Sequence, residues 1–210
     1  MSKQTQVTVK MERYDRMTRA RFLVFTATAF ATAILAVGGY NAHATGDGDD
    51  HHEGQDQDPR IARGFAIAPV PLSYDKDDRH KKELVGLGSY LVNAIGGCND
   101  CHTQPSYAPG HNPFMGQPKQ VNTAHYLGGG QSFGPFVSRN LTPENGLPAG
   151  RTFAQFKYEI RTGIDLDHLQ PQFGPFLQVM PWPTYQSLTD HDLRAIYEYL
   201  KSIPPATPGS

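Results

Sequence analysis

The sequence predicts an all-α fold, with three to five helices joined by long irregular loops. Three segments carry the periodicity and the end signals of helices, and no segment shows the alternation of apolar and polar residues that marks a strong strand. The 210 residues include 21 glycines and 17 prolines, which favour a loop-rich helical domain over an ideal bundle. Hydrophobic residues make up 38% of the chain, enough for a compact globular part.

The first predicted helix begins at Asp78. Leu84, Leu87 and Leu91 recur at i, i+3 and i+7, so they fall on one helix face and form an apolar stripe. The glycine pair at 96–97 is a stop signal. We therefore predict a helix from Asp78 to this pair.

The second and third predicted helices are marked by their N-caps. Thr152 and Gln155 have the spacing of a capping box, and Gly163 ends the apolar stripe that follows them. Thr189 is the predicted N-cap of the last helix, whose first turn carries acidic side chains that suit a helix N-terminus. The proline pair at 204–205 ends this helix.

Residues 1–44 have the pattern of an export signal. Basic residues precede an uncharged stretch at 22–40, and the small residues at 42–44 form an A-x-A site. We expect a signal peptide that is cleaved after Ala44. The alternative is an uncleaved membrane anchor, because the stretch approaches the roughly 20 residues that span a bilayer. Both interpretations place the rest of the chain in the periplasm, either free or anchored to the cytoplasmic membrane.

Residues 45–75 are predicted to form a flexible acidic linker and an extended lead-in. Residues 47–58 include six acids and no Lys or Arg, so this stretch cannot bury enough apolar surface to offset its ordering entropy. Pro69 and Pro71 argue against a regular helix in residues 59–74. The folded domain is therefore predicted at residues 76–206.

The charge of the chain excludes one class of partner. The 19 Lys and Arg residues nearly balance the 20 Asp and Glu residues, for a formal net charge of −1 at pH 7. A nucleic-acid-binding protein needs a concentrated basic patch, and the sequence contains none. We expect no nucleic-acid partner.

The only two cysteines lie in the pentapeptide CNDCH at 98–102. Cys98 and Cys101 have the spacing that lets two thiols add to the two vinyl groups of a haem, and His102 can then reach the iron. The following segment, 103–150, holds seven prolines and eight glycines without sustained periodicity, and a haem would supply the core that so long a loop lacks. Export agrees, because haem is attached covalently outside the cytoplasm. We therefore predict one covalent haem c.

Three other interpretations of the two cysteines are weaker. A disulfide oxidoreductase would need a strand–helix setting around its reactive cysteine, and this motif follows a helix and a glycine pair. A structural zinc site would need four ligands, and the remaining histidines are isolated in the sequence. A simple disulfide between Cys98 and Cys101 is compatible with an oxidising compartment.

Met180 is the predicted second iron ligand. It lies in the stretch QVMPWP at 178–183, whose prolines cannot continue a helix and hold the thioether on a stiff loop. The alternative role is that of a methionine packed in the core. The other candidate ligands are Met115, His111, His125, His168 and His191.

The order of these features resembles a class I monohaem cytochrome c. The stretches 88–92, 138–143, 153–163 and 180–200 are similar to one domain of the cytochrome subunits of periplasmic alcohol, aldehyde and gluconate dehydrogenases. The resemblance implies that His102 and Met180 are the axial ligands and that the first and last helices cross beside the haem edge. Those subunits usually carry three such domains and this chain carries one, so partner identity does not transfer.

A buried haem would need further support from the loops. Its two propionates require donors or cations, for which Arg139, Asn140 and the indole N–H of Trp182 are candidates. The plain alternatives are a surface arginine, a turn-forming asparagine and a core tryptophan. His102 should donate its other ring N–H to a backbone carbonyl, with Pro105 or another residue of the adjoining loop as acceptor. Six phenylalanines offer apolar lining: Phe133, Phe136, Phe153, Phe156, Phe173 and Phe176.

These features together predict an electron carrier without catalytic residues of its own. With His and Met both bound, the iron has no open position for a substrate. The expected partners are redox proteins: a dehydrogenase, an oxidase or another cytochrome. The alternative is a haem enzyme or small-gas sensor with an open sixth iron site, and a disulfide protein without haem is a third hypothesis.

Overall fold

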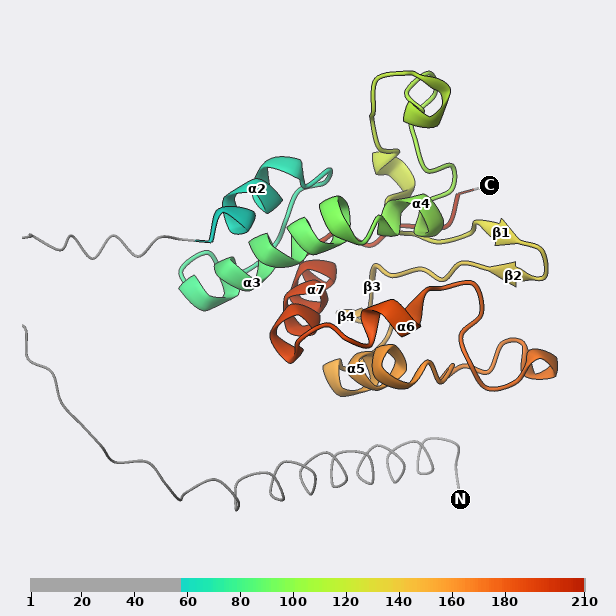
Figure 1. Ribbon diagram of the computed structural model, residues 1–210. Coiled ribbons are helices and arrows are strands. Elements are labelled where there is room, and N and C mark those ends of the chain that lie inside the picture. The colour runs from blue at the N-terminus through green and yellow to red at the C-terminus, as the bar shows by residue number, and fades with distance from the viewer. Residues whose placement is uncertain (1–57, 210) are drawn as a thin grey trace, which may run out of the picture. The chain divides into compact units, whose positions relative to one another are not determined.

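The computed structural model describes residues 58–209 (Figure 1). The predicted signal peptide or anchor, residues 1–44, and almost all of the predicted acidic linker lie outside the described residues. Within the described part, no helix is both long enough and apolar enough to cross a membrane.

The described residues form a helix-rich domain with a few very short strands. Residues 58–209 contain six α-helices, rather than the predicted three to five: α2 (Pro59–Ile67), α3 (Arg79–Tyr90), α4 (Cys98–His102), α5 (Phe153–Thr162), α6 (Trp182–Tyr185) and α7 (Asp190–Ser202). A π-helical turn, η1 (Leu91–Ile95), continues α3, and there are three 3-10 turns: η2 (Pro113–Met115), η3 (Thr123–His125) and η4 (Pro171–Phe173). The extra helices are short or lie next to prolines, where apolar periodicity has too few residues to appear.

Two antiparallel hairpins interrupt the helical pattern. One pairs β1 (Ser132–Phe133) with β2 (Phe136–Val137), and the other pairs β3 (Pro143–Glu144) with β4 (Leu147–Pro148). Each strand has only two residues, so alternation cannot be detected in the sequence. The expectation of a domain without strands is therefore wrong for the 103–150 loop, where both hairpins lie.

Helix α2 corrects the predicted extended lead-in. Residues 59–67 are helical, capped by Asp58, whose carboxylate accepts the N–H of Arg60 at 2.9 Å. Pro59 occupies the first turn, where a missing N–H is tolerated, and Pro69 lies beyond the helix end. The prolines therefore bound the helix instead of preventing it.

Helix α2 packs against α3 through two glycines. A Cβ added to Gly64 would lie 1.8 Å from the carbonyl oxygen of Gly86. Gly64 is also tied to α3 by a hydrogen bond, because the Ser89 hydroxyl donates to its carbonyl at 2.7 Å. The two backbones can approach so closely only because neither glycine has a side chain.

The three helices predicted from the sequence begin where predicted, and the two predicted N-caps, Thr152 and Thr189, cap their helices. Asp78 accepts the N–H of Lys81 at 2.9 Å, and both Thr152 and Thr189 form complete capping boxes. Helix α5 ends at Gly163, which has a φ of 67°. Helix α7 ends at Ser202, shortly before the proline pair. These predictions are confirmed.

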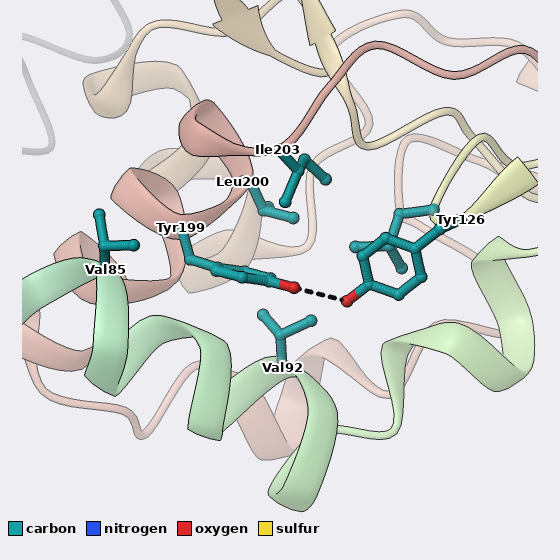
Figure 2. Packing of buried hydrophobic residues seen from close by; sticks show 7 residues of the cluster. Val85, Val92, Tyr126, Tyr199, Leu200 and Ile203 are labelled. Atoms are coloured by element: carbon teal, nitrogen blue, oxygen red, sulfur yellow. Dashed lines mark hydrogen bonds between the residues drawn. The ribbon is translucent and has the colours of Figure 1, made fainter. Parts of the chain in front are cut away.

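The core lies where α3, α7 and the loop at Tyr126 meet (Figure 2). Val85 and Val92 of α3 and η1 pack with Leu200 from α7. Tyr126 and Tyr199 are buried, and their hydroxyl groups are hydrogen-bonded at 2.9 Å. Apolar burial and one satisfied polar pair thus hold the loop against the two helices.

The C-terminal tail, residues 203–209, is hydrogen-bonded to the 103–150 loop. Asn140 donates its amide to the carbonyl of Ala206 at 2.7 Å, and the N–H of Ala206 donates to Thr142 Oγ1 at 3.1 Å. His125 Nδ1 lies 3.0 Å from the carbonyl of Thr207. Contacts from a distant segment therefore help to order this loop, in addition to its own two short hairpins.

Candidate functional site

A cavity of about 270 Å³ lies between α4, the β1–β2 hairpin and the segment before α6, and a neighbouring one of about 130 Å³ lies between η1, α5 and α7. Cys98, His102, Arg139 and Met180 belong to the walls of both. The other lining groups are mostly apolar, so a ligand there would be largely shielded from water. These four residues, among the eight that line both cavities, define the candidate site.

Helix α4 carries the CxxCH motif to the cavity wall. Gly97 has a φ of 58°, a conformation that suits glycine, and it turns the chain from η1 into α4. Cys101 lines the larger cavity beside Cys98. One short helix thus presents two thiols and an imidazole to the same space.

Both cysteines are free thiols in the structure, so the disulfide of the third hypothesis is not formed here. Burial raises the pKa of Cys98 to about 12, and burial also raises the pKa of Cys101. The thiols therefore stay protonated at neutral pH, unlike the low-pKa cysteine of a disulfide oxidoreductase.

His102 is oriented by one backbone carbonyl. Its Nδ1 lies 2.8 Å from the carbonyl oxygen of Arg139, so this nitrogen carries the proton. Burial lowers the pKa of His102, which favours the neutral ring and leaves the Nε2 lone pair for a metal. The acceptor is not Pro105, whose carbonyl accepts the amide of Asn122 at 3.0 Å, but another residue of the adjoining loop, which was the predicted alternative.

Met180 lies in the walls of both cavities, on a tight turn. Its N–H donates to the carbonyl of Gln178 at 2.7 Å, and its own carbonyl accepts the N–H of Trp182 at 2.8 Å. Val179 adopts a φ of 67°, which is unusual for a β-branched residue. These backbone constraints hold the Met180 thioether at the walls of the two cavities.

The other candidate iron ligands lie elsewhere. Met115 is 72% exposed on η2. None of the other candidate ligands lines either cavity: Met115, His111, His125, His168 and His191. Among the described methionines and histidines, His102 and Met180 therefore remain as the pair at these cavities.

Four of the six predicted phenylalanines line the cavities. Phe133, Phe136 and Phe176 belong to the larger one and Phe156 to the smaller one. Phe153 and Phe173 line neither: they pack on Tyr197 and Phe136, with ring centroids 5.4 Å and 4.9 Å apart. Aromatic content alone did not separate lining residues from packing residues.

Of the three predicted propionate partners, only Arg139 reaches the cavities. Asn140 donates to Ala206, and its amide oxygen accepts the N–H of Thr142 at 2.8 Å, so its side chain serves the loop and the tail. Trp182 stacks on Phe176, with ring centroids 6.2 Å apart, and lines neither cavity.

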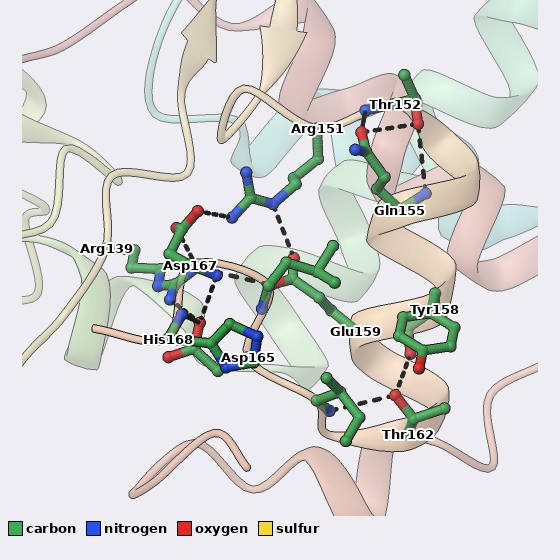
Figure 3. A network of polar contacts seen from close by, with 12 residues as sticks. Arg139, Arg151, Thr152, Gln155, Tyr158, Glu159, Thr162, Asp165, Asp167 and His168 are labelled. Atoms are coloured by element: carbon green, nitrogen blue, oxygen red, sulfur yellow. Dashed lines mark hydrogen bonds and ion pairs between the residues drawn. The ribbon is translucent and has the colours of Figure 1, made fainter. Parts of the chain in front are cut away.

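Sequence reasoning missed several charged and polar residues of the cavity walls. Arg151 and Glu159 line the smaller cavity and form an ion pair at 3.1 Å (Figure 3). Tyr185 lines both cavities and donates its hydroxyl to the carbonyl of Gly96 at 2.8 Å. No local motif marks these residues, because their role arises from the packing of α5 and α6 around the site.

No family model matches the chain. It is 33% identical over 127 residues to the cytochrome c subunit of a quinone-dependent alcohol dehydrogenase from Komagataeibacter europaeus, a match that covers 59% of this chain and 25% of that subunit. It is 30% identical over 126 residues to the cytochrome c subunit of gluconate 2-dehydrogenase from Pantoea cypripedii, covering 59% of this chain and 24% of that subunit. The chain is similar to a single domain of these cytochrome c subunits.

A third relative comes from a different dehydrogenase. The chain is 37% identical over 76 residues to a subunit of nicotinate dehydrogenase from Pseudomonas putida, a match that covers 35% of this chain and 6% of that protein. The chain therefore spans about a quarter or less of the length of the curated relatives it matches.

The donor set at the cavities fits a haem. No group of three or more His, Cys, Asp or Glu that could hold a metal ion occurs among residues 58–209. A haem iron needs fewer protein ligands, because the porphyrin supplies four nitrogens and the protein supplies only the axial ligands. The neutral His102, the thioether of Met180 and the two thiols are the groups that a covalent haem would use.

Proposed function

We propose that this chain is an electron-transfer cytochrome c domain with one covalent haem. Cys98 and Cys101 would hold the haem through thioether bonds, and His102 and Met180 would be its axial ligands. The observation that carries the proposal is that these four residues line one cavity although Met180 is 78 positions after His102 in the chain.

The proposed roles of the residues follow from their chemistry. A bound haem supplies an iron that accepts or releases one electron. His102 is held in the tautomer that offers Nε2 by its bond to the Arg139 carbonyl. With Met180 as the second ligand, no iron position remains for a substrate, and a thioether favours a higher reduction potential than a second histidine.

We also propose that the partners are redox proteins, with a dehydrogenase subunit as one candidate, and that the domain works in the periplasm. Apolar side chains surround the larger cavity, and three of them are more than half exposed: Val137, Leu169 and Val179. An exposed apolar rim of this size suits a small and transient electron-transfer interface. The names of the relatives support a dehydrogenase partner but do not identify which one.

The optical spectrum of the full chain, matured in a host that attaches haem c, tests the function. We expect a low-spin haem that stays on the protein after denaturation, with the near-infrared band of a methionine–iron bond in the oxidised form. Met180→Ala should abolish this band. The matched control, Met115→Ala, should keep it because Met115 is exposed and lines neither cavity.

Three outcomes would contradict the proposal in different ways. A high-spin ferric spectrum in the unaltered protein would favour the haem enzyme or sensor. Persistence of the near-infrared band in Met180→Ala would refute the ligand assignment. Absence of haem after export would leave the disulfide hypothesis.

A further inference from the structure

Arg139 contacts both sides of the candidate site with different parts of the residue. Its backbone carbonyl accepts the ring N–H of His102 at 2.8 Å. Its guanidinium group forms ion pairs with Asp165, with Asp167 at 2.7 Å and with Glu159 at 3.6 Å (Figure 3). Arg139 is therefore hydrogen-bonded to His102 and ion-paired with the segment that follows α5.

Asp165 in turn holds the start of the segment that leads to Met180. Its carboxylate accepts the backbone N–H groups of Asp167 at 2.9 Å and of His168 at 3.1 Å. Its own N–H donates to the carbonyl of Pro175 at 2.8 Å, on the returning arm of the loop. Both arms of the loop thus meet where Asp165 contacts Pro175, and Pro175 is five residues before Met180.

The pair between Arg139 and Asp165 is well shielded from water. The side chain of Arg139 is 22% exposed and that of Asp165 is 13% exposed. Burial alone would raise the pKa of Asp165, but the charge and hydrogen bond of Arg139 hold this pKa below its usual value. A shielded pair of this kind loses much more than a surface pair when one partner is removed.

We infer that Arg139 is a positioning residue that links the orientation of His102 to the position of the Met180 segment through Asp165. The inference rests on the proposed function and extends it to a residue that would neither bind the iron nor carry the electron. The backbone carbonyl could come from almost any amino acid, so only the guanidinium group explains why an arginine is suited to this position.

The rival role of Arg139 is a direct contact with the haem carboxylates. In the structure its guanidinium group already binds three acidic side chains, two of which also bind Arg151. The two roles differ in what Asp165 does. If Arg139 acts through Asp165, removing the charge of Asp165 should loosen Met180; if Arg139 binds the carboxylates, this change should leave Met180 in place.

The test compares Arg139→Gln, Asp165→Asn and the double variant in the full chain with its haem. Imidazole is added to the oxidised protein, and loss of the near-infrared methionine–iron band gives the concentration at which Met180 is displaced. We expect this concentration to fall by about tenfold in each single variant, equivalent to about 1.4 kcal/mol. The double variant should show little further fall, because both changes break the same link.

Matched controls remove a charge elsewhere. Arg63→Gln on α2 and Asp77→Asn before α3 alter exposed residues and should leave the imidazole titration unchanged. Arg139→Lys keeps the charge and should recover part of the lost resistance to imidazole. If Arg139→Gln fails to mature, Asp165→Asn still tests the link, since it leaves Arg139 intact.

An unchanged imidazole titration in Asp165→Asn would overturn the inference. So would additive effects of the two variants, because additivity would mean that they act separately. A shifted reduction potential in Arg139→Gln alone would assign Arg139 to the haem carboxylates. These results differ from failure of the proposed function, in which the unaltered protein itself would lack the methionine–iron band.

Discussion

Gly88 of α3 lies directly against the backbone carbonyl of Ala195 in α7. A Cβ added to Gly88 would lie 2.0 Å from that oxygen and 2.7 Å from the Cβ of Tyr199. The two helices therefore cross at a point where only hydrogen atoms fit between them. Leu91 and Leu200, near this crossing, line the smaller cavity, so the crossing also positions part of the candidate site.

Gly88→Ala should destabilise the fold by about 1–3 kcal/mol, because the added methyl group forces α3 and α7 apart. Urea unfolding monitored by circular dichroism measures this loss. Lys82→Ala, on an exposed position of the same helix, is the control and should change stability by less than about 0.5 kcal/mol. Equal stability of the two variants would show that the helices do not cross as closely as the structure indicates.

Tyr199→Phe should cost about 1–3 kcal/mol of stability. The lost hydroxyl is hydrogen-bonded to Tyr126 at 2.9 Å and to the amide of Asn93 at 3.0 Å, and its removal leaves buried polar groups with fewer partners. Tyr74→Phe serves as the control, since no hydrogen bond of the Tyr74 hydroxyl is found among the described residues and its ring still stacks on Phe65. Thermal unfolding of both variants would separate a hydroxyl effect from a ring effect.

The same tyrosines predict a loss of stability in alkali. Burial raises the pKa of Tyr126 well above its ordinary value of 10.0, and burial also raises the pKa of Tyr199. A raised pKa means that the folded state retains protons that the unfolded state releases. The contribution of these tyrosines to the free energy of unfolding is therefore complete below about pH 10 and falls as the pH rises. Denaturant midpoints between pH 8 and pH 11 should therefore drop.

The alkaline loss should be smaller in Tyr199→Phe, which has one buried phenol fewer. The absorbance of ionised tyrosine, followed in parallel, should show two classes of phenol, with the buried class appearing only as the protein unfolds. A single class that titrates near pH 10 in the folded protein would contradict this account.

Gly163→Ala should disturb the segment that carries Met180. Gly163 has a φ of 67°, and an added Cβ would lie 2.2 Å from the ring of Trp182. Gly116→Ala is the matched control, because Gly116 has a φ of 73° in the same left-handed region and nothing lies within 4 Å of the added carbon. We expect Gly163→Ala to be less stable than Gly116→Ala by about 1–3 kcal/mol.

Near-ultraviolet circular dichroism of Trp182, the chain's single tryptophan, would report this clash directly. The indole signal should change in Gly163→Ala and persist in Gly116→Ala. Indistinguishable spectra would mean that Trp182 does not pack on Gly163.

Local sequence signals predicted the long helices well. The side chains of Asp78, Thr152 and Thr189 compete for nearby backbone N–H groups, and this chemistry acts over three residues wherever the chain goes. The same locality misled the prediction at residues 59–67. There, the prolines suggested an extended chain, but α2 forms in front of Pro69 and is completed by packing on α3.

The sequence by itself determined the chemistry that this protein can use. The covalent chain fixes the spacing of Cys98, Cys101 and His102, and the prolines around Met180 stiffen its turn in any fold. Tertiary structure alone decided which side chains gather at the cavity. Arg139 meets Glu159 and Asp165 only because its loop packs against α5 and the segment that follows α5, and contacts across 20 and 26 positions of the chain leave no local sequence pattern.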